Sequence, residues 1–399
     1  MLSLISILAG YITYITMGLN LSNTKLGIIG GGQLGKMLNL AAHNWHLDTY
    51  VIDPNENCSC ASSSIQLTKG DFTDYQTVYN FGKDKDLLTI EIEKINVDAL
   101  KALEKEGVKV YPEPRVIELI QDKGLQKEFY KERNLLSSNF ILLENKQAVL
   151  DKLEAGEIKI PFVQKSRKDG YDGKGVHIVK DTQDVEELMD VACVIEDLVD
   201  IQKELAVIIA RNNQGETASF PVVEMEFNSK ANLVEYLACP SAISKEIEEK
   251  AIDIATSCIN AFNMTGILAV ELFLTKDGKV LINEVAPRPH NSGHHTIEAC
   301  ITSQFEQHLR AILGLSLGST ALKSPAVMVN VLGEPGYKGD AIYEGLEDCL
   351  TVEGFKFHIY GKKDTKPFRK MGHATILDAD IEKAKEKARF VQKKLKVIA

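Results

Sequence analysis

Short apolar segments alternate with helical segments over roughly the first quarter of the chain, and this order constrains the fold more than any other feature. Lys25–Gly30 and Thr49–Asp53 have the composition of buried strands, and Gln33–Trp45 between them has the apolar spacing of a helix. Leu87–Glu93 and Val108–Tyr111 are the next expected strands. Strands that are joined by helices pair in parallel through right-handed crossovers. The sequence therefore predicts an α/β domain with a parallel sheet.

A glycine-rich turn, Gly30–Gly35, follows the first strand and matches the pattern G-x-G-x-x-G, with Asp53 at the end of the next strand. Free backbone N–H groups at a helix N-terminus bind phosphate, so the turn suits a dinucleotide or a phosphate monoester. A tight turn with close packing of helix against strand explains the same residues. The turn alone therefore leaves an NAD-dependent dehydrogenase open as an alternative.

From Glu204 onward the sequence contains longer alternating apolar stretches, which are typical of an antiparallel sheet. The expected strands are 205–211, 218–227, 266–275 and 279–287. Helices are expected against this sheet at 242–262 and 296–313. A basic C-terminal helix is predicted from apolar residues at helical spacing, namely Ile381, Ala384, Ala388, Val391 and Leu395.

Two glutamates face each other across a predicted hairpin. Asp277-Gly278 is a preferred pair for a two-residue type I′ turn between the strands that carry Glu271 and Glu284. Counting outward from that turn places the two carboxylates directly opposite each other, with Cβ atoms about 5 Å apart. Opposed, half-buried carboxylates repel unless something neutralises them. Hard oxygen ligands select Mg²⁺, so we predict a magnesium site, to which the adjacent Asn283 contributes through a phosphate or water.

The segment that follows the hairpin is dense in polar side chains. Arg288 is interpreted as a fork for phosphate or carboxylate oxygens. His290, His294 and His295 raise zinc as an alternative, but no Cys and no H-E-x-x-H pattern accompanies them.

A glycine-rich segment follows Lys165, the residue that ends an apolar strand. Gly170, Gly173 and Gly175 are interleaved with cations, a composition that suits a mobile cover over polyphosphate. The Walker A pattern is absent, and an ordinary exposed hairpin is the alternative. Glu196–Val199 is interpreted as a connector that offers backbone groups to adenine, with Glu204 suited to ribose hydroxyls.

Composition limits the possible partners and the compartment. The net charge of −10 argues against broad nucleic-acid binding, and seven cysteines in 399 residues form no disulfide framework. Reduced thiols favour a cytoplasmic location. Residues 1–24 carry no charged side chain, and they lack the positive region of a signal peptide and the length of a span. We expect a poorly ordered extension and no membrane partner.

In order and spacing these motifs resemble the ATP-grasp ligases, and within them the 5-(carboxyamino)imidazole ribonucleotide synthases of de novo purine synthesis. The resemblance covers residues 25–380, and the matching stretches are GGGQLGKM (30–37), TIEIE (89–93), GYDGKG (170–175), INEVAPRPHNSGH (282–294), SQFEQHLRAI (303–312) and FRKMGH (368–373). The combination of GYDGKG with RPHNSGH is specific, whereas single stretches are not.

The resemblance implies an ATP-grasp fold, α/β overall and α+β in its ATP-binding part. A Rossmann-like pre-ATP-grasp domain is expected at 25–122, after the extension at 1–24. The ATP-grasp domain is expected at 123–315, with a small lid at about 137–195 and an antiparallel-sheet part. A small C-terminal domain completes the chain at 316–399.

The family, as the resemblance implies, consists of ATP-dependent carbon–nitrogen ligases. They join bicarbonate to aminoimidazole ribonucleotide through carboxyphosphate and release ADP and phosphate. The implied cofactors are ATP and Mg²⁺, or Mn²⁺ in its place, and the implied partners are the two small-molecule substrates and a second copy in a homodimer. Because carboxyphosphate hydrolyses quickly, a lid must exclude water.

Matched position by position, the resemblance implies four groups of site residues. The ATP site comprises Lys123, Lys165, Gly170, Tyr171, Asp172, Gly173, Lys174, Gly175, Val176, Glu196, Asp197, Leu198, Val199, Glu204, Asn283 and Glu284. The metal ligands are Glu271 and Glu284. The ribonucleotide site comprises Gln33, Leu34, Glu91, Lys362, Arg369 and Lys370. The residues expected around bicarbonate and the amine are Tyr171, Asp172, Arg288, His290 and Asn291.

The chain departs from the family pattern at three positions. Phe227 replaces a nucleotide-contacting histidine, Lys94 replaces an asparagine, and Asp169 replaces a glycine. These departures put single contacts in question, and the ligase reaction that the resemblance implies is still expected. The alternatives that remain are a sister ligase such as the formate-dependent glycinamide ribonucleotide transformylase, the dehydrogenase, and a non-catalytic nucleotide-binding regulator.

Overall fold

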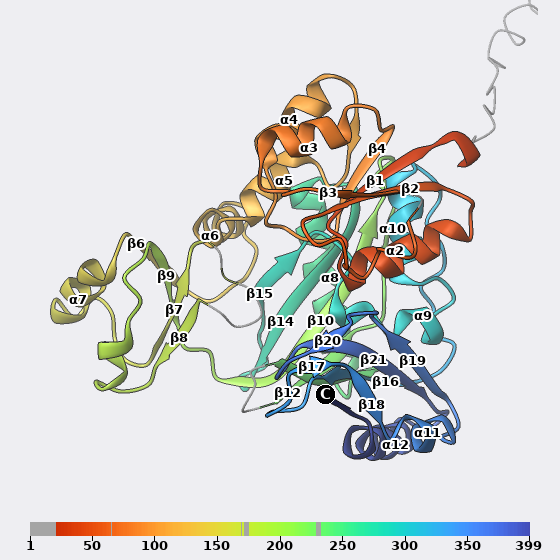
Figure 1. Ribbon diagram of the computed structural model, residues 1–399. Coiled ribbons are helices and arrows are strands. Elements are labelled where there is room, and N and C mark those ends of the chain that lie inside the picture. Colours follow the sequence, from red (N-terminus) through yellow and green to blue (C-terminus); the bar gives the residue numbers. More distant parts are fainter. Residues whose placement is uncertain (1–20, 65, 169, 171–174, 229–232) are drawn as a thin grey trace, which may run out of the picture.

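The computed structural model describes residues 21–64, 66–168, 170, 175–228 and 233–399 (Figure 1). The expected N-terminal extension therefore lies almost wholly outside the described residues. Within them, no helix is both long and apolar enough to cross a membrane. The architecture is mixed α/β, as predicted, and the described residues form one parallel sheet, one larger antiparallel sheet and smaller antiparallel sheets.

The first part of the chain forms a parallel sheet, which confirms the prediction from strand–helix alternation. The described residues give it five strands in the order β3-β2-β1-β4-β5. The strands are β1 (Lys25–Ile29), β2 (Asp48–Asp53), β3 (Gln66–Lys69), β4 (Leu87–Ile90) and β5 (Lys109–Val110). The helices are the short η1 (Leu21–Asn23), α2 (Gln33–His43), α3 (Tyr75–Gly82) and α4 (Val97–Lys105). Buried Leu26, Ile28 and Val51 pack between this sheet and α2.

Two helices lead into a small protruding sheet. They are α5 (Pro114–Ile120) and α6 (Lys123–Glu132), and Asp122 caps α6 by accepting the N–H groups of Gly124 and Leu125. The protruding sheet has the order β6-β9-β7-β8 among the described residues, and every pair in it is antiparallel (Figure 1). Its elements are β6 (Phe140–Leu143), α7 (Lys146–Glu154), β7 (Phe162–Ser166), β8 (Val176–Val179), η2 (Asp184–Glu187) and β9 (Cys193–Asp197).

A large antiparallel sheet forms the centre of the molecule. Its described strands follow the order β15-β14-β10-β12-β13-β16-β21-β19, and β11 pairs with β10. The first six in the chain are β10 (Ile201–Arg211), β11 (Thr217–Ser219), β12 (Val223–Asn228), β13 (Leu233–Cys239), β14 (Gly266–Thr275) and β15 (Val280–Ala286). The others are β16 (Ala326–Leu332), β19 (Phe355–Ile359) and β21 (Lys370–Leu377). The sheet thus continues into the C-terminal part through the β13–β16 pair.

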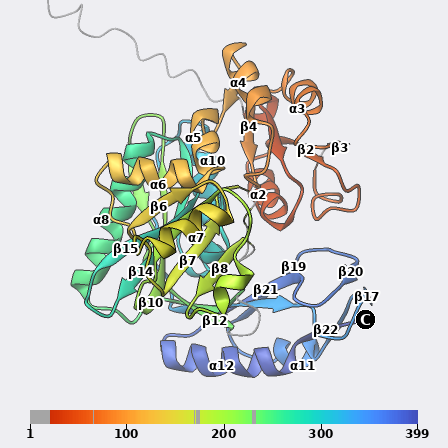
Figure 2. The same cartoon turned by 90° about the vertical axis from the view of Figure 1, so that its left-hand side faces the viewer.

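Helices cover the central sheet, as the alternating apolar residues of its strands predict. Helix α8 (Lys245–Phe262) packs Ala255 and Ile259 against β10 and β14, and α12 (Ile381–Lys394) packs Ala388 and Val391 against β16 and β21. Figure 2 shows α12 along the outer side of the C-terminal strands. The remaining elements are η3 (Asn291–Gly293), α9 (Thr296–Ala299), α10 (Gln304–Ile312), β17 (Gly339–Asp340), β18 (Ile342–Glu344), α11 (Leu346–Leu350), β20 (Asp364–Thr365) and β22 (Lys396–Ile398).

One predicted helix is wrong as a single element. The segment 296–313 is interrupted, because Cys300 adopts an extended conformation after α9 and Ser303 begins a new helix. The Ser303 side chain accepts the N–H of Glu306, which fixes the start of α10. The interruption places Gln304 in the first turn of α10, close to the segment that follows β15.

Candidate active site

The β14–β15 hairpin holds Glu271 directly opposite Glu284, as predicted, but by a different route. The turn contains three residues rather than two: Leu274 pairs with Val280, and the N–H of Thr275 donates to the carbonyl of Lys279. Gly278 closes this turn in a left-handed conformation (φ 80°). A bulge at Asn283 then adds one residue to β15 and restores the opposition.

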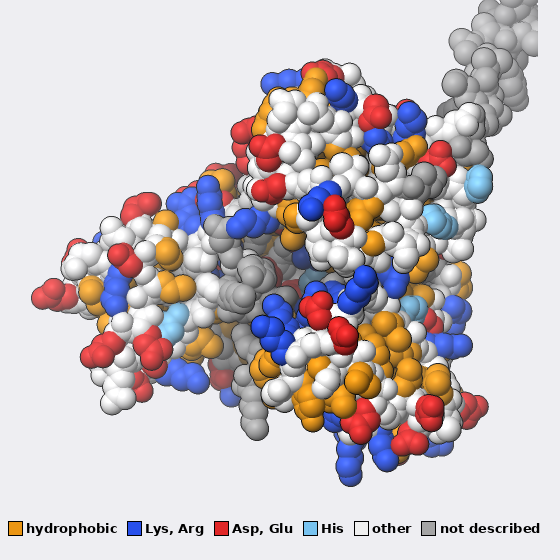
Figure 3. All heavy atoms as spheres, in the orientation of Figure 1, with side chains coloured by type: hydrophobic (Ala, Val, Ile, Leu, Met, Phe, Trp, Pro, Cys, Tyr) orange, Lys and Arg blue, Asp and Glu red, His pale blue; other side chains and the backbone are white. Residues whose placement is uncertain are grey.

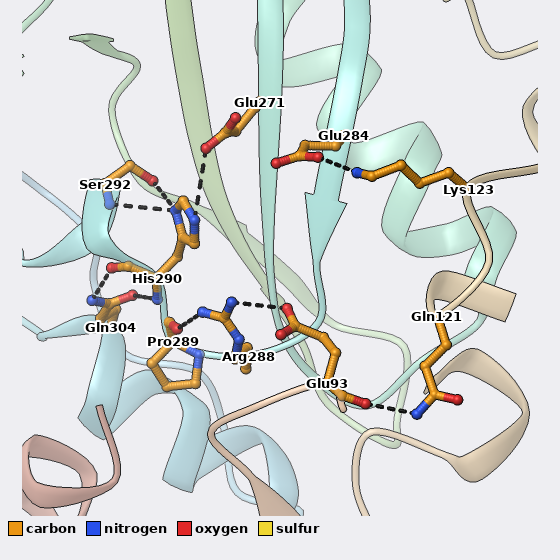
Figure 4. Close-up of polar contacts among 10 residues, drawn as sticks. All are labelled: Glu93, Gln121, Lys123, Glu271, Glu284, Arg288, Pro289, His290, Ser292 and Gln304. Atoms are coloured by element: carbon orange, nitrogen blue, oxygen red, sulfur yellow. Dashed lines mark hydrogen bonds and ion pairs between the residues drawn. The ribbon is translucent and has the colours of Figure 1, made fainter. Parts of the chain in front are cut away.

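The two carboxylates differ in their surroundings (Figure 4). The Lys123 ammonium lies 2.5 Å from Glu284 Oε2 and lowers the pKa of that carboxyl to about 2. Burial, and then the negative charge of Glu284, raise the pKa of Glu271 to about 8. His290 Nε2 lies 3.6 Å from Glu271 Oε1. The pair therefore concentrates negative charge that a divalent cation can neutralise.

The donor set fits Mg²⁺ better than zinc. In the described part of the chain no three His, Cys, Asp or Glu side chains gather as a metal-ligand set. Mg²⁺ is commonly held by one or two carboxylates together with substrate phosphates and water, and Glu271 and Glu284 are an opposed carboxylate pair of this kind. His294 is buried and stacks on His373 with ring centroids 4.5 Å apart, which leaves the zinc alternative without support.

A buried network of cations surrounds Glu196. Lys165 Nζ lies 3.2 Å from Glu196 Oε1 and donates to Asn283 Oδ1 at 2.9 Å. Lys127 Nζ lies 3.3 Å from the same Glu196 oxygen, and Ser138 Oγ donates to its other oxygen at 2.6 Å. Burial opposes ionisation of Glu196, but the two lysines outweigh it and lower its pKa. Burial also lowers the pKa of Lys127, to about 8.

Sequence reasoning missed Lys127 and Ser138. Lys127 lies four residues after Lys123 on α6, hence on the same helix face, and this spacing was the available signal. The network also shows that the Glu196 side chain faces Lys127 and Lys165.

Glu204 lies on β10 beside this network. Burial raises the pKa of its carboxyl to about 7, and the charge of Lys165 opposes that rise. Val176 on β8 is the direct partner of Lys165 on β7, and Val176 and Ile178 are exposed apolar residues of that strand. The expected ATP residues on β7, β9, β10 and β15 are thus brought to one region.

The contacts of the glycine turn favour the second of its two interpretations, a tight turn that packs helix against strand. The N–H of Gly31 donates to Asp53 Oδ2 at 2.8 Å, and the N–H groups of Gly32 and Gly35 donate to Glu91 at 2.8 and 3.1 Å. The protein's own carboxylates therefore occupy these donors. Gly35 is required for packing, because a Cβ there would lie 2.7 Å from the carbonyl oxygen of Gly30.

The segment after β15 brings Arg288 and His290 next to the carboxylate pair (Figure 4). Arg288 Nη2 lies 2.9 Å from Glu93 Oε1, and Gln121 Nε2 donates to the Glu93 carbonyl. His290 Nδ1 lies 2.9 Å from Ser292 Oγ. Asn291 follows at the start of η3. These contacts orient the guanidinium and the imidazole toward the same region as Glu271.

The expected ribonucleotide residues come from the two ends of the chain. Lys36 of α2 donates to the carbonyl of Ile359 at 2.9 Å, which ties α2 to the C-terminal strands. Arg369 Nη1 lies 2.6 Å from Asp364 Oδ2, and Lys362 Nζ donates to the carbonyl of Lys370 at 2.8 Å. Figure 3 shows a hollow between the N-terminal and C-terminal parts with Lys and Arg side chains at its rim.

Two further ribonucleotide residues lie at the start of α2. Gln33 is half-buried there, whereas the Leu34 side chain belongs to the core. Glu91 faces the turn before α2, where burial raises the pKa of its carboxyl and the N–H bonds from Gly35 and Gly32 oppose that rise.

Part of the expected lid lies outside the described residues. This part comprises Tyr171, Asp172, Gly173 and Lys174, together with the departure at Asp169. The side chain of Phe227 on β12, outside the lid, is not described either. Gly175 is described and is left-handed (φ 75°), and its carbonyl accepts the N–H of Ser166 at 2.8 Å.

Comparison with protein families matches the whole architecture. The ribonucleotide synthetase preATP-grasp domain matches residues 23–121, and the ATP-grasp domain matches 128–305. The phosphoribosylaminoimidazole carboxylase C-terminal domain matches 326–387.

Curated relatives carry related names. A chloroplastic phosphoribosylaminoimidazole carboxylase of Vigna aconitifolia is 38% identical over 89% of this chain, which spans 64% of that longer protein. The N5-carboxyaminoimidazole ribonucleotide synthase of Bacillus subtilis is 35% identical over 88% of this chain and 91% of its own length.

Solved structures agree with the family matches. The N5-carboxyaminoimidazole ribonucleotide synthetase of Thermotoga maritima has a TM-score of 0.87 and 44% identity, covering 94% of this chain and 99% of its own. The Aspergillus clavatus synthase in complex with ADP and 5-aminoimidazole ribonucleotide has a TM-score of 0.85 and 30% identity, covering 93% and 98%. The chain belongs to the N5-carboxyaminoimidazole ribonucleotide synthase family of ATP-grasp ligases.

Proposed function

We propose that this chain carboxylates 5-aminoimidazole ribonucleotide with bicarbonate at the expense of ATP, giving N5-carboxyaminoimidazole ribonucleotide, ADP and phosphate in purine biosynthesis. The observation that carries the proposal is the opposed pair of Glu271 and Glu284 with Lys123 and Lys165 beside it. The Aspergillus clavatus relative, whose described complex contains ADP and the same ribonucleotide, supports the choice of substrates.

Glu271 and Glu284 are the proposed ligands of Mg²⁺, or of Mn²⁺ in its place. The bound cation supplies charge neutralisation at the phosphoryl group that is transferred. Lys123 and Lys165 are proposed to contact the phosphates. Asn283 and Glu196 hold Lys165 in place for this task, because both accept from its ammonium group.

The remaining ATP contacts follow from the connector and the lid. The backbone of Asp197–Val199 is proposed to bind adenine, and Glu204 to bind the ribose hydroxyls. The lid segment Gly170–Val176 is proposed to cover the phosphates and exclude water. Tyr171 and Asp172, which lie outside the described residues, keep their proposed place near bicarbonate.

The ribonucleotide is proposed to bind between α2 and the C-terminal strands. Arg369 and Lys370 supply cations for its phosphate. The other proposed residues around the ribonucleotide are Lys362, Gln33, Leu34 and Glu91. Arg288, His290 and Asn291 are proposed to hold bicarbonate and the amine. Arg288 suits this role because a guanidinium binds planar oxyanions with two parallel hydrogen bonds.

The bond changes balance in two steps. A bicarbonate oxygen attacks the γ-phosphorus, the bond to the ADP oxygen breaks, and carboxyphosphate forms. The amine of the ribonucleotide then attacks the carboxyl carbon, or carbon dioxide released from it in the closed site. The carbon–oxygen bond to phosphate breaks, and the amine gives up a proton. A site that fixes both substrates before the first step limits loss of carboxyphosphate to water.

Release of inorganic phosphate from ATP tests the proposal. It is expected only when aminoimidazole ribonucleotide and bicarbonate are both supplied. Glycinamide ribonucleotide with formate, supplied instead, is expected to release none, which distinguishes the sister transformylase. Phosphate release at the same rate with either substrate pair and with neither pair would contradict the proposal.

The proposal includes a homodimer in the cytoplasm. All seven cysteines are free thiols, as a reducing compartment requires. Sedimentation at twice the 44.2 kDa mass of the chain is the expected result for a dimer.

A further inference from the structure

The side chain of Gln304 closes two hydrogen bonds with the backbone of His290 (Figure 4). The N–H of His290 donates to Gln304 Oε1 at 2.9 Å, and Gln304 Nε2 donates to the carbonyl of His290 at 2.8 Å. Gln304 is fully buried, with 0% of its surface exposed. The carboxamide thus bonds both the N–H and the carbonyl of His290, as a neighbouring strand does in a sheet, although His290 lies after the end of β15.

The surrounding residues hold the carboxamide itself. The N–H of Gln304 donates to Thr296 Oγ1 at 2.8 Å, and that hydroxyl donates to the carbonyl of Gly293 at 2.6 Å. A Cβ on Gly293 would lie 2.4 Å from Gln304 Oε1, so glycine is what allows the carboxamide to approach. Ser303, the residue before Gln304, caps α10 by accepting the N–H of Glu306.

The clamped backbone carries the polar groups of the site. His290 Nε2 lies 3.6 Å from Glu271 Oε1, and Arg288, two residues earlier, pairs with Glu93 at 2.9 Å. The two backbone hydrogen bonds to Gln304 therefore fix the backbone from which the His290 imidazole projects toward Glu271. A displacement of about 1 Å in such a site can cost about 100-fold in rate.

We propose that Gln304 is a positioning residue for the carboxylation, because its carboxamide fixes the His290 backbone and thereby the imidazole against Glu271. The inference deepens the proposed function and rests on it. Gln304 touches neither substrate in this account, and it acts only through His290.

The same helix provides a matched control. Gln307 is also 0% exposed, its Nε2 donates to the carbonyl of Gly318 at 2.9 Å, and the N–H of Gly318 donates to its Oε1 at 2.8 Å. Gly318 lies in the connection between α10 and β16, which carries none of the proposed site residues. Gln304→Leu and Gln307→Leu thus each remove two side-chain-to-backbone hydrogen bonds made from α10. Those of Gln304 reach a proposed site residue, and those of Gln307 do not.

The experiment compares kcat, KM for ATP and the unfolding midpoint in both variants. Similar decreases in the midpoint are expected, because each variant leaves one buried N–H and one buried C=O without a partner. Gln304→Leu should lower kcat at least about tenfold with KM for ATP within about twofold of wild type. Gln307→Leu should retain the wild-type kcat. Equal kcat values in the two variants would overturn the proposal.

Gln304→Glu supplies a second variant in case Gln304→Leu does not fold. The introduced carboxyl keeps the acceptor for the His290 N–H, and it donates to the His290 carbonyl only when protonated. Its activity relative to wild type should therefore fall as pH rises, since the donor is lost on ionisation. A ratio that stays flat at the wild-type level across the pH range would refute the clamp.

A signal that does not depend on turnover separates this inference from the proposed function. The ring ¹³C resonance of His290, assigned through His290→Asn, should move in Gln304→Leu and stay in place in Gln307→Leu. An unmoved resonance in Gln304→Leu would overturn the inference even in an active enzyme. If wild type releases no substrate-dependent phosphate, the proposed function fails, and the resonance still decides whether Gln304 positions His290.

Discussion

Glu271 and Glu284 stand opposite each other in one hairpin, yet their surroundings move the pKa values of the two carboxyls in opposite directions. The Lys123 ammonium lies 2.5 Å from Glu284 Oε2 and lowers the pKa of that carboxyl. Burial, and then the negative charge of Glu284, raise the pKa of Glu271. Because a metal ligand must be deprotonated, binding of a cation to both carboxylates is favoured as pH rises.

Replacing Glu284 with Gln tests the metal site, because it removes the charge and keeps the size. At limiting Mg²⁺ kcat should fall at least about 100-fold, the scale of losing one electrostatic element of the transition state. Titration calorimetry with Mg²⁺ and a non-hydrolysable ATP analogue should show weaker binding as well. Glu224→Gln, which breaks the Lys203–Glu224 pair on the same sheet, is the control and should keep both values. Wild-type behaviour of Glu284→Gln would exclude Glu284 as a ligand.

Replacing Arg369 with Ala tests the proposed phosphate contact of the ribonucleotide. A charge-assisted hydrogen bond is worth about 1.5–3 kcal/mol, which corresponds to about 10- to 150-fold in affinity. KM for aminoimidazole ribonucleotide should rise by that factor, and KM for ATP should not change. Arg389→Ala on the exposed side of α12 should change neither constant. A parallel rise of both constants in Arg369→Ala would indicate a folding defect instead.

Replacing Lys127 with Met tests the buried network around Glu196. Removing one partner of a buried ion pair costs about 3–5 kcal/mol, and Lys165 remains at 3.2 Å, so we expect a loss of about 3 kcal/mol in the free energy of unfolding. Glu196 will then hold Lys165 alone, and KM for ATP should rise at least about tenfold. Urea unfolding and initial rates measure both effects. Lys203→Met is the control, and an unchanged KM for ATP in Lys127→Met would contradict the role of the network.

His308 predicts a specific loss of stability in acid. Its Nδ1 accepts the N–H of Ile267 at 3.2 Å, its Nε2 lies 2.8 Å from Thr89 Oγ1, and burial lowers its pKa to about 3. The folded pKa is lower than the unfolded value of 6.5, so the unfolded chain takes up the proton first and stability falls as pH decreases from 6.5 toward 3.

Between pH 7 and pH 5, wild type should lose about 2 kcal/mol more unfolding free energy than His308→Gln. Urea titrations at the two pH values measure the difference. Parallel losses in the two proteins would mean that His308 does not titrate in this way.

Periodicity predicted the elements whose burial pattern is strong and failed where that pattern is weak. The buried strands β1, β2 and β4 and the amphipathic helix α12 follow directly from apolar spacing. Strand β3, with the sequence QLTK and no buried residue, gives no such signal and was missed. The break at Cys300 was missed for a different reason, because helical spacing continues across it in 296–313 although Cys300 is extended.

The carboxylate pair was predicted correctly from a wrong turn. One additional turn residue and one bulge residue, Asn283, compensate each other, and no sequence rule used here locates a bulge. The contacts Lys127–Glu196 and Gln304–His290 depend on how separate elements pack. Spacing along the chain places Lys127 on the same face of α6 as Lys123, but it does not identify a partner on another element. The glycine turn matched a phosphate-binding pattern, but Asp53 and Glu91 accept hydrogen bonds from its N–H groups, as the tight-turn alternative allows.

Transfer of oxygen from bicarbonate to phosphate tests the central claim most directly. In the proposed reaction a bicarbonate oxygen becomes the bridge of carboxyphosphate and leaves with the phosphorus when the carbon–oxygen bond breaks. With ¹⁸O-labelled bicarbonate, ATP and aminoimidazole ribonucleotide, mass spectrometry of the inorganic phosphate should find one ¹⁸O atom per phosphate released. Phosphate that contains oxygen from water and none from bicarbonate would contradict the account.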